Sequence, residues 1–288
     1  ILVVKDTVIG DVAQVKVIKT KKNYGYGRLL AITEPSPDRT EPRCSLARSC
    51  GGCQIQQMSY EKQLAFKENK VRNLLERVGK VKDYTMHPIM GMDEPWHYRN
   101  KAQFPVGLNK EGQVVTGFYA GRTHSIIDCE TCFIQDPCNE VVLPVVRAWM
   151  KESGIRPYDE EKHQGLVRHI LTRRGFKTGE IMVCLVINGR KLPRQKELIR
   201  ALTKIDGMKS ISYSINMEKT NVILGESAVT IWGEDTITDY IGNVKYQISP
   251  LSFYQVNPVQ TEKLYNAALK YADPGPDDVI WDLYCGIG

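Results

Sequence analysis

Six of the eight cysteines of the chain fall into two groups whose spacing could support metal chemistry. The first group, Cys44, Cys50 and Cys53, places three thiols within ten residues. Gly51 and Gly52 separate the last two thiols, and glycine permits the backbone dihedrals that a chain needs to wrap closely around an inorganic group. Three local thiolates with one distant thiolate are a usual way to hold a cubane iron–sulfur cluster.

The second group, around Cys129 and Cys132, leaves three interpretations of the cysteines open. Cys50-x2-Cys53 with Cys129-x2-Cys132 is a paired pattern that suits tetrahedral zinc, but it leaves Cys44 without a role. An iron–sulfur cluster uses Cys44 and leaves Cys129 spare. Buried thiols without a metal are the third interpretation, because cysteine is among the most buried residue types.

The length and composition are ordinary for a soluble globular protein of one large domain or two to three smaller ones, and a cytoplasmic location is the default expectation. The chain has 288 residues, and its net charge of +6 suits a phosphate-bearing partner without requiring one. Charged residues interrupt every apolar stretch before it reaches the length of a membrane span. The start, Ile1–Val4, lacks the basic leader and cleavage site of a signal peptide.

Hydrophobic periodicity predicts strands near the start of the chain and mostly short strands with turns from Trp96 to Ile248. The predicted strands lie within Asp11–Ile32 and over Leu166–Thr172, Glu180–Ile187, Ser210–Ile215 and Val244–Ile248. Helices are expected over Ser59–Gly79, with Ser59 as the N-cap, over about Arg194–Ile205, and after Asn257-Pro258. Runs of strands of this kind predict a mostly antiparallel α+β domain.

The end of the chain has the pattern that opens a nucleotide-binding sheet. Val279–Trp281 reads as a buried strand, and the Gly-rich turn Asp282–Gly288 follows it directly. In such sheets the glycines of the first turn let the backbone approach the ligand. The three prolines of Glu34–Pro42 mark a boundary near the start of the chain.

Ordered motifs resemble those of the bacterial uracil-5-methyltransferases that act on ribosomal RNA, which are class I S-adenosylmethionine-dependent enzymes. The resemblance covers nearly the whole chain. The motifs that carry it are Cys44-x5-Cys-Gly-Gly-Cys-x-x-Gln-Gln, His97–Lys101, Gly117–Tyr119, Ile126–Asp128 with Cys132, Arg168-His169, Thr178–Glu180, Ser252–Asn257 and Asp282–Gly286.

The resemblance implies two cofactors, a 4Fe–4S cluster and S-adenosylmethionine. In the family the fourth cluster ligand is the cysteine that here is Cys132, so the implied ligands are Cys44, Cys50, Cys53 and Cys132. The donor contacts that carry over are Gln255, Tyr284 and the turn glycine Gly286. The family's nucleophilic cysteine and its base lie beyond the donor motif, so no catalytic residue is expected within these 288 residues.

Basic residues interleave with tyrosines near the start of the chain, a combination used by OB-type RNA binders. The expected RNA contacts are Lys19, Lys21, Lys22, Tyr24, Arg28 and Arg168. A solvated basic strand is an equally good interpretation from the residues alone. The resemblance assigns this segment to the latter part of a TRAM domain, an OB-like barrel.

The expected architecture is therefore multidomain, α+β and α/β. Residues 1–42 form a partial TRAM barrel, 43–248 a central, mostly antiparallel domain with the cluster, and 249–288 the start of a Rossmann-like methyltransferase domain. The expected function is methylation of uridine carbon 5 in 23S ribosomal RNA by a full-length protein that is monomeric. The alternatives are a transfer-RNA uracil-5-methyltransferase and a non-catalytic RNA-binding module with structural zinc.

Overall fold

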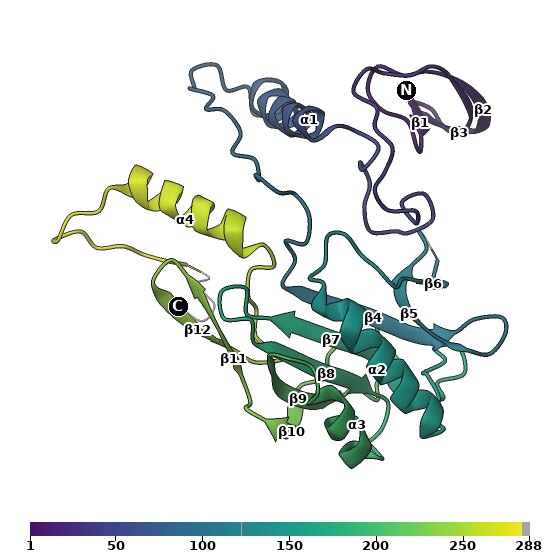
Figure 1. Ribbon diagram of the computed structural model, residues 1–288. Coiled ribbons are helices and arrows are strands. Elements are labelled where there is room, and N and C mark those ends of the chain that lie inside the picture. Colours follow the sequence, from purple (N-terminus) through teal and green to yellow (C-terminus); the bar gives the residue numbers. More distant parts are fainter. Residues whose placement is uncertain (122, 284–288) are drawn as a thin grey trace. The chain divides into compact units, whose positions relative to one another are not determined.

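The structure is a computed structural model that describes residues 1–121 and 123–283 (Figure 1). The chain divides into two compact units, Ile1–Pro95 and Trp96–Gly288. Each unit has its own sheet, and each is described by itself below. None of the helices in the described ranges is long and apolar enough to cross a membrane.

The first unit combines a three-stranded sheet with one long helix. Its elements are β1 (Leu2–Val4), β2 (Val12–Thr20), β3 (Gly25–Glu34), α1 (Tyr60–Asn73) and a π-helical turn, Leu74–Val78. β2 and β3 form an antiparallel hairpin, and β1 pairs with β3 in parallel. The strands predicted within Asp11–Ile32 are thereby confirmed.

An ion pair, Arg39 with Asp11, ties the loop after β3 to the start of β2. Two parallel contacts of 3.0 and 2.5 Å join the guanidinium to the carboxylate, and the backbone N–H groups of Val8 and Ser36 also donate to it. The hydrogen bond from Arg39 is the main reason why the pKa of Asp11 lies far below its usual value. Bidentate pairs of this kind are among the stronger polar contacts in proteins.

The helix predicted over Ser59–Gly79 is confirmed at both ends. The Ser59 hydroxyl accepts a hydrogen bond from the Lys62 N–H at 3.3 Å, and Gly79 follows the last turn. The expected apolar face exists, yet none of its residues is buried; Val71 and Val78, for example, are 48% and 73% exposed. The periodicity therefore located the helix but did not identify a core.

The second unit is built on a seven-stranded sheet with the order β10-β9-β8-β7-β4-β5-β6. Its elements are β4 (Lys101–Leu108), β5 (Val114–Tyr119), β6 (Ile126–Asp128), α2 (Cys138–Glu152), β7 (Val167–Arg174), β8 (Ile181–Ile187), α3 (Gln195–Leu202), β9 (Met208–Ile215), β10 (Ala228–Gly233), β11 (Ile237–Ile241), β12 (Val244–Ile248) and α4 (Pro258–Ala272). All neighbours in the large sheet are antiparallel except β8 and β9. The mostly antiparallel pattern and the predicted strands are confirmed.

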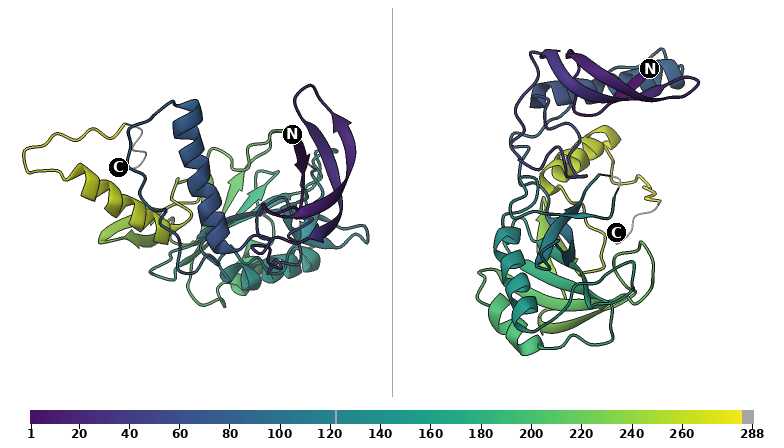
Figure 2. Two further views of the ribbon diagram at one scale, coloured as in Figure 1. Left: turned by 90° about the horizontal axis from the view of Figure 1, so that it is seen from above. Right: turned by 90° about the vertical axis from the view of Figure 1, so that its right-hand side faces the viewer.

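The core lies between this sheet and two helices. α2 and α3 cover the same face of the sheet (Figures 1 and 2). Val146 and Met150 of α2 and Leu198 of α3 are fully buried against residues such as Leu185 of β8. Every residue of β8 is buried, which explains why its sequence is a continuous apolar run rather than an alternating one.

The helix α2 was missed by the sequence analysis, which expected strands and turns there. Pro137 precedes its first residue and Pro144 lies inside it. Proline within a helix removes one backbone hydrogen bond and normally argues against that assignment. Here the burial of Val142, Val146 and Trp149 outweighs that local cost.

The hairpin β11–β12 and the segment that follows it pack on the opposite side, around Met182 of β8. Side chains of the β7–β8 turn hold the hairpin: the hydroxyl of Thr178 donates to the Thr238 carbonyl at 2.6 Å, and the Thr238 N–H donates to Glu180 at 2.7 Å. Lys177 then pairs with Glu262 of α4 at 2.9 Å. These contacts join the large sheet to the region that begins at residue 249.

The predicted helix after Asn257 is confirmed, whereas the predicted strand Val279–Trp281 is wrong. The Asn257 side chain accepts a hydrogen bond from the Gln260 N–H at 3.1 Å, as an N-cap does. Val279 and Trp281 are 83% and 80% exposed and are not in a strand. A strand needs a neighbour for its backbone hydrogen bonds, and no described segment pairs with this one.

Candidate functional site

The segment from Ser249 to Asn257, which contains Gln255, forms a closed loop between β12 and α4. The hydroxyls of Ser249 and Ser252 lie 2.8 Å apart, and each accepts a hydrogen bond from the other residue's N–H at 3.1 Å. Tyr254 is buried, and its hydroxyl donates to Asp239 of β11 at 3.2 Å. Burial, followed by the Asp239 charge, raises the pKa of Tyr254 well above its usual value.

Two buried side chains, one just before β4 and one in β7, anchor the backbone of the same segment. Asn100, just before β4, donates from its side chain to the Gln255 carbonyl and from its backbone to the Val256 carbonyl, both at 3.0 Å. Arg173 of β7 donates to the carbonyls of Pro250 (3.3 Å) and Ser252. The backbone on both sides of Gln255 is thus tied to a rigid sheet.

This arrangement can orient a polar side chain toward a small ligand. Gln255 is partly buried, and its amide offers both a donor and an acceptor. A site carried by a segment that buried neighbours hold in place is more precise than one on an unsupported loop. Sequence reasoning identified Gln255 but missed its anchors. The signals were present: Asn100 stands in the His97–Lys101 motif, and Arg173 belongs to a basic pair on a strand.

The other two predicted donor contacts, Tyr284 and Gly286, lie outside the described residues. Their contribution stays a prediction.

The three cysteines of the first unit lie on a loop before α1, and all are half-buried. The Cys50 sulfur accepts a hydrogen bond from the Gly52 N–H at 3.4 Å. The Cys44 N–H donates to the Gln56 side chain at 3.2 Å. Within residues 1–121 and 123–283, no three His, Cys, Asp or Glu side chains lie close enough together to hold a metal.

In the second unit, the sequence analysis treated Cys129 as spare, but the structure makes it a partner of Cys132. A hydrogen bond from Cys129 is the main cause that lowers the pKa of Cys132 to about 6. Cys129 is 5% exposed, and its thiol also contacts the Thr131 carbonyl at 3.3 Å. The CxxC spacing was the signal that the two thiols lie together.

The basic residues predicted to contact RNA differ in their surroundings. Lys19, Lys21, Lys22, Tyr24 and Arg28 are exposed on β2, β3 and the turn between them. The ring of Tyr24 meets that of Tyr26 edge to face, with centroids 5.6 Å apart. This hairpin therefore presents cations and an accessible aromatic ring together.

Arg168, by contrast, is 5% exposed and is engaged within the second unit. Its guanidinium donates to the carbonyls of Asn216, Glu218 and Thr220 and lies over the Tyr158 ring at 4.5 Å. Its role in RNA contact stays a prediction.

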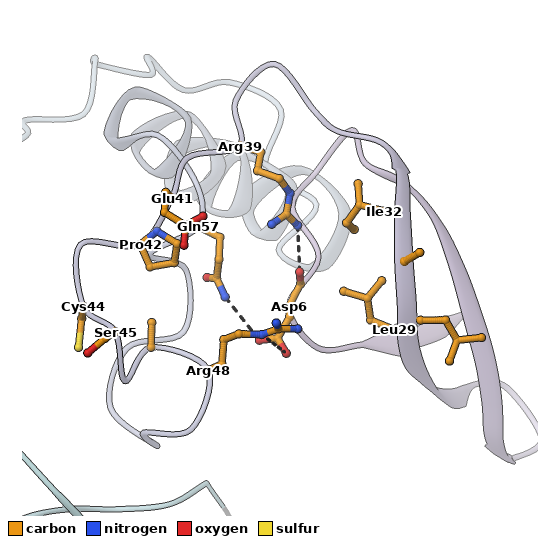
Figure 3. Close-up of a pocket in the computed structure, with 13 residues that line it drawn as sticks. Asp6, Leu29, Ile32, Arg39, Glu41, Pro42, Cys44, Ser45, Arg48 and Gln57 are labelled. Atoms are coloured by element: carbon orange, nitrogen blue, oxygen red, sulfur yellow. Dashed lines mark hydrogen bonds and ion pairs between the residues drawn. The ribbon is translucent and has the colours of Figure 1, made fainter.

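A pocket of about 360 Å³ lies in the first unit between β3 and the cysteine loop (Figure 3). Asp6 is central to it: Gln57 approaches one carboxylate oxygen at 3.4 Å and Arg48 the other at 3.7 Å, while Arg39 donates to its backbone carbonyl. The polar groups that line the pocket mostly form hydrogen bonds and ion pairs with one another. We therefore interpret these contacts as structural, holding the segments around the pocket together.

The anchoring of the Gln255 segment leads to a direct prediction. Arg173→Met should remove the donors to Pro250 and Ser252 and leave both carbonyls unpaired. Because hydrogen bonds to charged groups contribute about 1.5–3 kcal/mol, amide hydrogen exchange across residues 251–256 should accelerate about tenfold or more. Arg190→Met, at an exposed turn position, is the matched control. Unchanged exchange in Arg173→Met would show that the segment is held by other contacts.

No protein-family model matches the chain. The chain is 48% identical to an uncharacterized RNA methyltransferase of Clostridium tetani, over 99% of this chain and 62% of that protein. A protein of the same name from Clostridium acetobutylicum is 49% identical, with the same coverage. One from Halalkalibacterium halodurans is also 49% identical, over 97% of this chain and 61% of that protein.

Among solved structures, the chain is similar to the tRNA (uracil-54, C5)-methyltransferase of Pyrococcus abyssi in complex with S-adenosyl-L-homocysteine. The TM-score is 0.71 at 24% identity, over 93% of this chain and 60% of that one. This likeness shows a shared fold. The chain spans about 62% of the length of its curated relatives. Over nearly its whole length it is therefore a homologue of proteins named as RNA methyltransferases.

Proposed function

We propose that the full-length protein transfers a methyl group from S-adenosylmethionine to carbon 5 of a uridine in RNA. The observation that carries this proposal is the Ser-Phe-Tyr-Gln-Val-Asn segment, anchored by hydrogen bonds from Asn100 and Arg173, in a chain 48% identical to a relative named as an RNA methyltransferase. The proposal also agrees with the fold, which is shared with a uracil-C5 methyltransferase solved in complex with S-adenosyl-L-homocysteine.

The proposed chemistry explains why a cysteine and a base are needed as well as a donor site. Carbon 5 of uracil is a poor nucleophile. A thiolate that adds to carbon 6 converts the ring into an enolate, and carbon 5 then takes the methyl group. A base removes the carbon 5 proton, the carbon 6–sulfur bond breaks, and the free thiolate returns. We propose that both residues lie outside these 288 residues and that Gln255 orients the donor.

We propose ribosomal RNA of the large subunit as the substrate. The reason is the resemblance of the cysteine motif and the N-terminal segment to the ribosomal-RNA enzymes, because bacterial transfer-RNA enzymes of this family generally lack both features. The alternative, a transfer-RNA substrate, has the printed activity of the Pyrococcus abyssi protein in its favour. At 24% identity that protein supports the fold and does not decide between the two RNAs.

We further propose a 4Fe–4S cluster bound by Cys44, Cys50, Cys53 and Cys132. The donor chemistry suits it: all four thiols are partly accessible, the Cys50 sulfur accepts a hydrogen bond, and the hydrogen bond from Cys129 lowers the pKa of Cys132. A cluster bound there would tie the glycine-rich loop in place. The proposed ligand set comes from the resemblance of the sequence.

The first prediction separates the substrate alternatives. Full-length protein with labelled S-adenosylmethionine should methylate unmodified 23S ribosomal RNA and leave unmodified transfer RNA unlabelled. The 288-residue chain should not label either RNA, because it lacks the proposed nucleophile. Labelling of transfer RNA alone would favour the alternative, and turnover by the 288-residue chain would show that the active site is misplaced.

The second prediction concerns the metal. Anaerobically purified full-length protein should contain about four iron and four sulfide ions per chain, as a cubane cluster requires. Cys132→Ser should lose them, whereas Cys129→Ser should retain them, because Cys129 is only a hydrogen-bond partner in this scheme. One tightly bound zinc ion without sulfide would contradict the cluster and support the zinc interpretation.

The third prediction concerns the basic hairpin. Replacing Lys19, Lys21 and Lys22 with Ala should weaken RNA binding. It should also make the negative slope of log affinity against log salt shallower by about two, since each lysine on a phosphate releases about 0.7–0.9 counterions. A matched triple variant, Lys191, Lys196 and Lys204 to Ala, should leave the slope unchanged. Equal slopes for all three proteins would mean that the hairpin is only a solvated face.

A further inference from the structure

Three basic side chains meet where β4 begins and β7 ends. Lys101 of β4 and Arg173 of β7 are direct partners across the antiparallel pair, so both project from the same face of the sheet. Arg99 stands two residues before Lys101. Like charges directly opposite each other on neighbouring strands are destabilising. A sequence that places a lysine and an arginine there therefore breaks a local rule, and such exceptions concentrate at functional sites.

No carboxylate of the described residues balances the positive charges of this cluster, although the charge of Arg99 also acts on the Cys132 thiol and helps to lower its pKa. Arg174, the neighbour of Arg173, pairs with Asp136 at 3.5 Å. In contrast, neither Lys101, Arg99 nor Arg173 has a carboxylate within salt-bridge distance in residues 1–121 and 123–283.

Burial raises the energetic cost of positive charges that have no carboxylate partner. Arg173 is 2% exposed, and its guanidinium meets only carbonyl oxygens; its Nε has no hydrogen-bond partner in the described structure. Lys101 is half-buried. Burial first, and then the charges of Arg173 and Arg99, lower the pKa of Lys101 to about 8. An anion beside Lys101 would favour its charged form and so oppose this shift.

The position of the cluster indicates which reactant supplies the anion. Arg173 also holds Pro250 and Ser252, so the cluster adjoins the anchored Gln255 segment. S-adenosylmethionine carries a sulfonium and an ammonium against one carboxylate, so its net charge is positive and the cluster repels it. RNA carries one negative charge per phosphate, and lysine is a common point-charge ligand of phosphate.

We propose that Lys101, supported by Arg99 and Arg173, binds a phosphodiester group of the RNA substrate beside the donor segment. This inference rests on the proposed function and adds to it a phosphate site in the second unit, separate in sequence from the basic hairpin. Lys101 would make the direct contact, because Arg173 is committed to the backbone of the donor segment.

The test uses full-length protein with Lys101→Met, Lys101→Arg and the exposed-lysine control Lys196→Met. Binding of 23S ribosomal RNA is measured over a series of salt concentrations. The slope of log affinity against log salt is negative, and Lys101→Met should make it shallower by about 0.7–0.9, the value for one phosphate contact. Lys101→Arg and Lys196→Met should keep the wild-type slope. The dissociation constant of S-adenosylmethionine, measured without RNA, should be the same in all four proteins.

A second readout guards against a trivial folding defect. Without RNA, Lys101→Met should melt at the same temperature as wild type or higher, because it removes a like-charge repulsion; a structural lysine would give a lower value. An unchanged salt slope in Lys101→Met, with wild-type methylation intact, would overturn the phosphate site alone. Weaker donor binding with an unchanged slope would assign the cluster to the donor carboxylate instead. If wild-type protein neither bound nor methylated RNA, the proposed function would fail as well.

Discussion

The pairing of β4 with β7 is the constraint on which the second unit depends. Successive residues of a strand point to opposite faces. Ile170 of β7 therefore packs in the core beneath the helices, while Arg173 reaches the backbone of the segment around Gln255. Asn100, at the start of β4, holds the next residues of that segment. A core built from one face thereby positions the candidate donor site on the other.

Much of the fold was accessible from the sequence because local patterns and tertiary contacts agree there. The apolar run of β8 predicts a buried central strand, and β8 is buried at every position. Ser59 and Asn257 satisfy backbone N–H groups at helix starts, as their residue types predict. For the site, the motif around Gln255 identified the segment that the structure shows to be anchored.

The remainder depended on long-range contacts that no local pattern contains. One proline precedes α2 and another lies inside it, and its helical state follows from burial of Val146 and Met150 against the sheet. Val279–Trp281 is apolar enough for a strand, yet a strand requires a hydrogen-bonding neighbour. In the sequence Arg173 is one of several basic residues. Only the fold brings it into contact with a carbonyl that lies 77 residues away along the chain.

The proposal that the full-length protein attacks carbon 5 of uridine can be tested on the bond that must break. RNA labelled with tritium at carbon 5 of uridine is incubated with the full-length protein and S-adenosylmethionine, and tritium released to water is compared with methyl groups transferred. The account predicts one tritium released for each methyl group, because the carbon 5 proton must leave. Methyl transfer with full retention of tritium would place the methyl group elsewhere on the nucleotide and contradict the account.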